Sequence, residues 1–181
     1  MTERDEILTL LPDSTKGTPP KPFARPLPTE QELWDIFELR LTELGGQIFG
    51  PSQLELLFGK NLMADEDAKP HLSHLLQNET DDVWSADFGI TLATCAVAET
   101  GTILIENAPG RNRLTSLAPP THVCIVRSDQ IVRSLDEAIA KIEDRTAVFI
   151  TGPSRTADIA GTLIRGVHGP KELWVIRLPE T

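Results

Sequence analysis

The chain has 181 residues, 40% of them apolar, which is enough to form the core of one ordinary domain. Its formal net charge of −10 argues against nucleic acid or another polyanion as the partner. No apolar run approaches the roughly 20 residues of a membrane helix, and the acidic N-terminus does not match a secretory signal, so we expect a cytoplasmic protein without membrane insertion.

Residues 1–28 predict a mobile N-terminal tail that ends in a proline-rich linker, and residues 29–181 predict an α/β domain. A docking role for the linker is an alternative, although no aromatic or charge pattern accompanies its prolines. Thr29 and Glu32 form a capping box, which predicts that a helix begins here. Apolar residues at helical spacing are expected to face the core: Leu33, Ile36, Phe37, Leu41 and Leu44.

The next segment predicts a short strand at residues 47–49 and a second helix beginning at Pro51, with Leu54, Leu57 and Phe58 inward. Two histidines, His71 and His74, then follow at a spacing of three. They could share a helical face and bind zinc, but no third ligand is close in the sequence. A plain surface helix is the simpler interpretation, and we predict no metal site.

Residues 86–106 contain few charges and many β-branched residues, which indicates core strands. Glu99 is conspicuous there because a Thr-Gly pair, Thr100 and Gly101, follows it at a tight turn. A carboxylate in such a place can face a cleft, where burial would raise its pKa and suit it to acid–base or nucleophilic chemistry. A strand-end glutamate that bonds to the turn is the equally open alternative.

Arg111 and Arg113 lie in a turn, where they could close on an anionic ligand or form a solvated loop. After them the chain predicts a strand at residues 122–127, a helix capped by Ser134 that buries Leu135, Ile139 and Ile142, and a strand at residues 147–150. Alternating strands and helices are typical of an α/β fold whose mostly parallel sheet is covered by helices.

A βαβ unit is predicted at residues 147–178, with a glycine turn at residue 152 and a helix from about Thr156 to Arg165. The first amides of a helix attract anions, although a plain helix cap by Ser154 or Thr156 is the commoner arrangement. The candidate anion or substrate site contains these residues: Thr100, Gly101, Gly152, Ser154, Arg155, Thr156 and Asp158. The rise of such a helix would place His168 roughly 15 Å from Ser154, so His168 would shape the last loop or meet a second subunit of an oligomer.

Three segments together resemble one family: AETGT at residues 98–102, TGPSRTADI at 151–159 and GVHGP at 166–170. Their order and separation are similar to those of the lactate-utilisation protein C family, the LUD domain. The resemblance implies a three-layer α/β/α fold of the sugar-phosphate-isomerase and CoA-transferase type. It also implies a role in oxidising L-lactate to pyruvate beside two iron–sulfur partner proteins. This chain resembles the short member without cluster cysteines, so we expect no cofactor in it.

The resemblance also puts Glu99 where CoA-transferase relatives carry a catalytic glutamate before a glycine. Three hypotheses follow for the chain. The first is a subunit of a lactate-oxidising iron–sulfur system. The second is a stand-alone enzyme for a phosphorylated or CoA-linked metabolite, with Glu99 and the turn at residues 154–158 as its site. The third is a purely structural partner. Glu99 and His168 are the catalytic candidates. No GxGxxG fingerprint for a dinucleotide follows any predicted strand.

Overall fold

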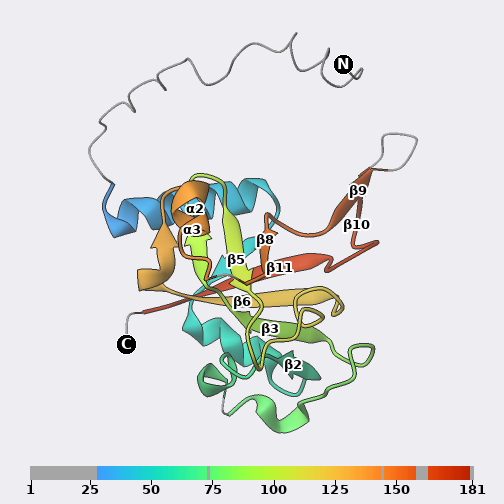
Figure 1. The fold of residues 1–181 in the computed structure, drawn as a ribbon. Helices are drawn as coiled ribbons and strands as arrows, with labels where there is room; N and C mark the ends of the chain where they lie inside the picture. The colour runs from blue at the N-terminus through green and yellow to red at the C-terminus, as the bar shows by residue number, and fades with distance from the viewer. Residues whose placement is uncertain (1–27, 73, 144, 158–162, 180–181) are drawn as a thin grey trace, which may run out of the picture.

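The computed structural model of the protein describes residues 28–72, 74–143, 145–157 and 163–179. Its centre is a parallel sheet of five strands in the order β1-β11-β6-β3-β2. The strands are β1 (Gln47–Phe49), β2 (Leu62–Ala64), β3 (Phe88–Leu92), β6 (Thr121–Arg127) and β11 (Glu172–Leu178). The expected α/β fold with a mostly parallel central sheet is therefore confirmed (Figure 1).

A second sheet of four strands packs against one face of the first, in the order β7-β4-β5-β8. It contains β4 (Cys95–Val97), β5 (Thr102–Glu106), β7 (Ile131–Val132) and β8 (Ala147–Ile150). The pairs β4·β5 and β5·β8 are antiparallel. The prediction that β8 and β11 belong to one parallel unit is therefore wrong, because β8 lies in this second sheet.

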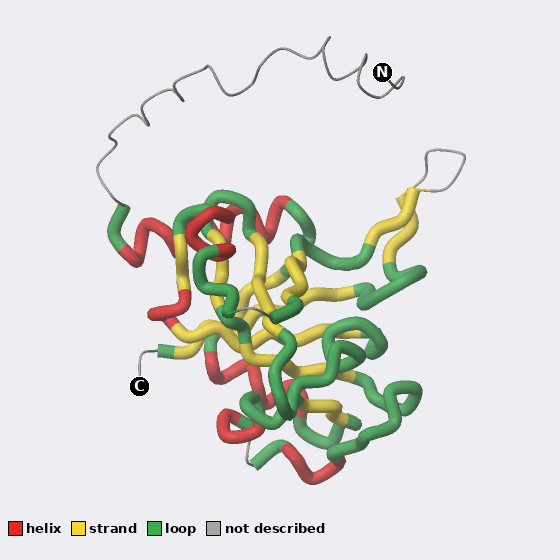
Figure 2. The backbone as a smooth tube through the Cα atoms, viewed as in Figure 1, coloured by secondary structure: helices red, strands yellow, loops and turns green. Residues whose placement is uncertain are grey.

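Helices are few in the described part of the chain, and strands and loops dominate (Figure 2). Two are α-helical, α2 (Glu30–Glu43) and α3 (Leu135–Ile139), and four are single 3-10 segments. The 3-10 segments are η2 (Pro51–Leu57), η3 (Lys69–His71), η4 (Leu76–Asn78) and η5 (Ser128–Gln130). None of the described helices is long and apolar enough to cross a membrane.

The core has two main parts, one on each face of the parallel sheet. Helix α2 and the second sheet cover one face, and the loops with η2 and η3 cover the other. The capping box at Thr29 forms as predicted, with the Glu32 amide 3.2 Å from the Thr29 hydroxyl. The inward face of α2 differs from the prediction, since Trp34 is buried while Ile36 is exposed. Trp34 is drawn inward because its indole N–H donates to the Ser128 carbonyl at 3.1 Å.

Two smaller predictions of burial also fail. Phe58 follows η2 and is exposed, although Leu54 and Leu57 are buried as expected. On α3, Ser134 caps the helix as predicted, but Leu135 and Ile139 face solvent and Ala138 is the buried residue. A helix of five residues presents little more than one turn, so spacing alone does not fix its inward face.

The predicted helix from Thr156 to Arg165 is wrong. Strands β9 (Arg155–Ala157) and β10 (Leu163–Arg165) form an antiparallel hairpin that projects from the body (Figure 1). In this hairpin Ile164 pairs with Thr156, and β-branched residues favour such cross-strand positions over a helix interior. The N-terminal tail and Asp158 lie outside the described residues.

Candidate functional site: a cavity between the two sheets

A cavity of about 220 Å³ lies where the amino ends of β6 and β11 approach β8. Its lining comes from four places: residues 148–154, residues 168–170, residues 116–117, and the two strand residues His122 and Leu173. Two of the three segments singled out in the sequence, TGPSRTADI and GVHGP, therefore contribute to one hollow. We name this hollow the inter-sheet cavity.

The hairpin explains why these two segments meet. It returns the chain to its starting point, so that Gly166 N–H donates to the Ser154 carbonyl at 3.0 Å and Ser154 N–H donates to the Pro170 carbonyl at 2.9 Å. A Cβ on Gly169 would lie 3.0 Å from the Cβ of Ser154. The GVHGP segment therefore packs this closely only because residue 169 has no side chain. His168 therefore borders the same cavity as Ser154. The prediction that they lie far apart is wrong, because the paired strands β9 and β10 stand where the helix was expected.

His122 is the buried polar residue of the inter-sheet cavity. It sits near the start of β6 and is 1% exposed. Its Nε2 lies 2.9 Å from the Thr91 hydroxyl on β3, and burial lowers the pKa of the ring to about 3. The ring is consequently neutral near pH 7. Sequence reasoning missed His122, and the available signal was a histidine placed directly before the apolar run of a core strand.

Threonine hydroxyls connect the cavity to the neighbouring turn. Thr100 donates to Thr102 at 2.8 Å, and Thr102 lies 2.9 Å from Thr151, which lines the cavity. Thr100 therefore supports the cavity wall from outside. Gly101 has φ +64°, and a Cβ there would lie 2.6 Å from the backbone nitrogen of Leu41, so its role is a close approach to α2.

The helix whose first amides were expected to attract an anion does not begin here, because Arg155–Ala157 form the strand β9. Gly152 lines the cavity with φ +90°, and Ser154 lines it as well. Arg155 instead donates from Nη2 to the carbonyl of Leu44, at the end of α2. Its guanidinium is thus bound to main chain, and Thr156 lies in β9 and is not one of the lining residues.

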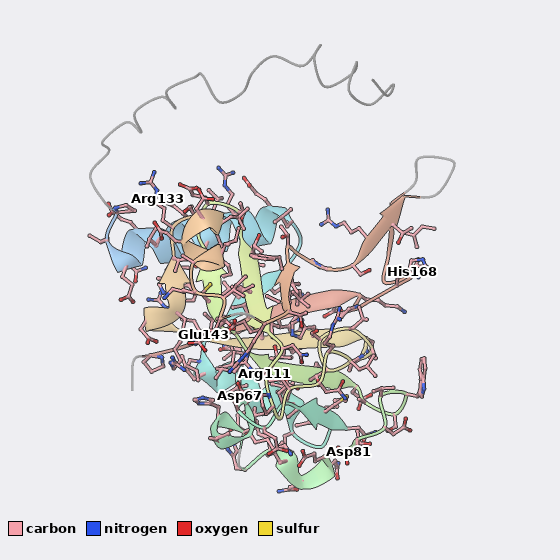
Figure 3. All side chains as sticks on the ribbon, in the orientation of Figure 1. Asp67, Asp81, Arg111, Arg133, Glu143 and His168 are labelled. Atoms are coloured by element: carbon pink, nitrogen blue, oxygen red, sulfur yellow. The ribbon has the colours of Figure 1, made fainter. Side chains whose placement is uncertain are left out.

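Glu99 does not face the inter-sheet cavity, so the expected shared hollow is wrong. It is exposed at the β4–β5 turn and pairs with Arg133, whose Nε is 2.9 Å from Glu99 Oε1. The groove beside this pair is lined by residues of α2, among them Leu33 and Ile36. Figure 3 shows Arg133 and His168 at well-separated places on the molecule. Glu99 is therefore also not the buried carboxylate that was expected.

Arg111 is half-buried and already bound. Its Nε donates to Asp67 at 2.8 Å and its Nη1 donates to the Glu106 carbonyl at 3.0 Å, so it holds two loops together (Figure 3). Arg113 is exposed beside a much smaller pocket that Asp65 also lines. Neither arginine lines the inter-sheet cavity.

His71 and His74 do not come together with further potential metal ligands among the described residues. His74 Nε2 lies 2.9 Å from Glu55 Oε1, and no group of three or more His, Cys, Asp or Glu side chains comes together there.

Cys95 and Cys124 are buried and free. Burial raises the pKa of their thiols to about 11 and about 12, so both behave as small apolar side chains.

Comparison with known proteins agrees with the resemblance seen in the sequence. The LUD domain model matches residues 65–178. Lactate utilization protein C of Deinococcus radiodurans is 30% identical over 94% of this chain and 93% of its own length. The protein of that name from an Exiguobacterium strain is 33% identical over 65% of this chain and 60% of its own length.

A solved structure shows the same fold. The crystal structure of a DUF162 family protein from Deinococcus radiodurans superposes with a TM-score of 0.68 at 24% identity, covering 84% of this chain and 99% of that one. The family model spans more than half of this chain and includes β3, β6, β11 and the whole inter-sheet cavity. This chain belongs to the LUD-domain family.

Proposed function

We propose that this protein serves a lactate-utilisation system and that the inter-sheet cavity is where it takes a small metabolite. The name of the Deinococcus radiodurans relative supports the first part, since the two chains align over nearly their whole lengths. The convergence of two family segments, residues 151–154 and 168–170, on one cavity supports the second part and is the observation that carries it.

The cavity suits a small polar molecule. About 220 Å³ is less than the roughly 300–1,000 Å³ of pockets for drug-sized ligands. Phe149, Ile150 and Leu173 supply apolar walls, while Ser154, His122 and His168 supply polar groups. Few polar groups against an apolar wall give a ligand one orientation.

The electron-transfer chemistry belongs to partners in this proposal. An ordinary iron–sulfur cluster needs four thiolates, and this chain has two cysteines, both buried with raised thiol pKa values. We therefore propose iron–sulfur proteins as partners, no cluster in this chain, and a cytoplasmic location. The alternative of a CoA-linked or phosphorylated substrate with Glu99 as catalytic carboxylate has no geometric support, because Glu99 lies outside the cavity.

Cell extracts from a host that lacks this protein provide the test. L-lactate-dependent dye reduction is measured before and after adding purified wild-type protein, His168→Ala or His74→Ala. Wild type and the His74 control, which lies outside the cavity, should restore the rate. His168→Ala should lower it by about tenfold, the effect of losing one good hydrogen bond to a ligand.

Two results would count against the proposal in different ways. A full rate without any added protein would remove the role in lactate utilisation. Ser116→Leu is a second variant, which narrows the cavity. A full rate with each of the two variants, His168→Ala and Ser116→Leu, would leave that role intact but place the ligand elsewhere.

A further inference from the structure

His122 has one ring nitrogen that protein groups satisfy and one that they do not. Nε2 meets the Thr91 hydroxyl at 2.9 Å, and the described residues offer no hydrogen bond to Nδ1. Among the described residues, Asp67 Oδ1 is the single fully buried side-chain oxygen or nitrogen without a partner. His122 borders the inter-sheet cavity, so a partner for Nδ1 would come from that space.

A chain of neighbouring donors favours one position for the proton of the His122 ring. The Cys124 thiol keeps its proton, since burial raises its pKa to about 12, and it points to the Ile125 carbonyl at 3.9 Å. The Thr91 hydroxyl donates toward Cys124 Sγ at 3.6 Å, which leaves its oxygen free to accept from His122 Nε2–H. Nδ1 is then an unprotonated acceptor.

The opposite arrangement is less favourable. If Thr91 donated to Nε2, the proton of the neutral ring would sit on Nδ1 and would form a buried N–H donor without a protein partner. Unpaired buried N–H groups are rarer in proteins than unpaired acceptors. The hydrogen-bond network thus favours the tautomer whose Nδ1 lone pair faces the cavity.

We propose that His122 selects the ligand of this cavity: its Nδ1 accepts a hydrogen bond from a ligand hydroxyl, so a small 2-hydroxy acid binds in preference to the corresponding 2-keto acid. The proposal rests on the proposed function, which makes the cavity the ligand site. A keto oxygen is only an acceptor, so it would face the His122 lone pair without a bond and leave a buried acceptor unpaired.

Thr91 is the positioning residue in this arrangement. It touches no ligand, since it lies outside the cavity lining, but its hydroxyl holds the His122 tautomer. Thr91→Val keeps the shape of the side chain and removes the hydroxyl. We expect this variant to bind ligand more weakly and to lose its preference for the hydroxy acid, because the ring can then place its proton on either nitrogen.

The first test reads the tautomer without any ligand. Nitrogen-15 NMR of histidine-labelled wild-type protein should show Nε2 protonated and Nδ1 unprotonated for His122 at pH 7, and a mixture of tautomers in Thr91→Val. A proton on Nδ1 in the wild type would overturn this inference and leave the proposed function untouched.

The second test measures binding by calorimetry with L-lactate and pyruvate as probes. Wild type should prefer lactate by about tenfold or more, which is the order expected for one unpaired buried acceptor. His122→Asn, whose amide oxygen can replace Nδ1, should keep part of the preference. His122→Gln, whose amide reaches toward Thr91 instead, should lose it while keeping a similar melting temperature.

The outcomes separate the two proposals. Equal binding of the two acids by wild type would overturn the selection by His122 alone. Binding of neither acid would overturn both this inference and the assignment of the cavity as the ligand site.

Discussion

The buried, neutral His122 predicts a specific dependence of stability on pH. In the unfolded chain the ring has an ordinary pKa of 6.5, whereas burial lowers the pKa in the folded protein to about 3. Between these values the unfolded chain takes up a proton that the folded protein excludes, so acid favours unfolding. Each pH unit in this window lowers the free energy of unfolding by about 1.4 kcal/mol through His122.

Lowering the pH from 7 to 5 should therefore cost the wild type about 2 kcal/mol through this residue, since most of the effect begins below pH 6.5. His122→Gln removes the titrating ring, so its free energy of unfolding should fall by that much less over the same interval. Other groups titrate equally in both proteins, and the difference between the two curves isolates His122.

The assay is guanidinium unfolding followed by tryptophan fluorescence at several pH values. Ile125→Val on the same strand is a matched control, because it removes one buried methyl group at a cost of about 1 kcal/mol and leaves the pH dependence unchanged. Parallel curves for wild type and His122→Gln would show that the folded protein protonates His122 freely. That result would refute the neutral histidine on which the ligand selection depends.

Three further variants test other parts of the structure. Glu99→Gln should leave lactate-dependent dye reduction unchanged, because Glu99 is exposed outside the cavity; a loss of the rate would restore its catalytic role. Gly89→Ala should lower the free energy of unfolding by about 3 kcal/mol or more, since a Cβ would lie 1.8 Å from the Thr115 carbonyl oxygen. Gly59→Ala, which has open space around it, should lower it by about 1 kcal/mol. Equal melting temperatures for the two alanine variants would contradict that packing. Asp65→Asn should change the free energy of unfolding at pH 7 by less than about 1 kcal/mol, because both hydrogen bonds to the Asp65 side chain end on Oδ1 and burial raises the pKa of its carboxyl group. As the pH falls, the free energy of unfolding of the wild type should rise relative to that of this variant. The opposite slope in denaturant unfolding would contradict the raised pKa.

Local signals in the sequence were sufficient for several elements. Thr29 and Glu32 predicted the start of α2, and two apolar runs in the second half of the chain predicted β6 and β11. Each of these depends on residues that are neighbours in sequence, such as a cap three residues before its partner. The parallel arrangement of β6 and β11 also followed from their order along the chain.

The sequence did not indicate which distant segments pair as strands. β8 reads like any short apolar strand, and only the structure shows that it joins β5 rather than the parallel sheet. The helical spacing of residues 156–165 rested on a few apolar positions, and the β-branched pair of Thr156 and Ile164 forms a hairpin instead. That single difference moved His168 beside Ser154.

The candidate site was predicted in part for the same reason. Ser154, Gly152 and His168 were identified from motifs, and all three line the inter-sheet cavity. Glu99 was identified from its glycine turn, which says nothing about which side of the molecule it faces. His122 was missed because its importance comes from burial beside Thr91, a contact between two strands that the sequence does not reveal.

The four histidines of the chain allow one direct test of the cavity as the ligand site. His122 and His168 line the cavity, whereas His71 and His74 lie outside it. Histidine-labelled protein is titrated with L-lactate at constant pH and followed by NMR. We expect the signals of His122 and His168 to shift with one common dissociation constant while those of His71 and His74 stay in place. Saturable shifts confined to His71 and His74, or no shift at any of the four, would contradict it.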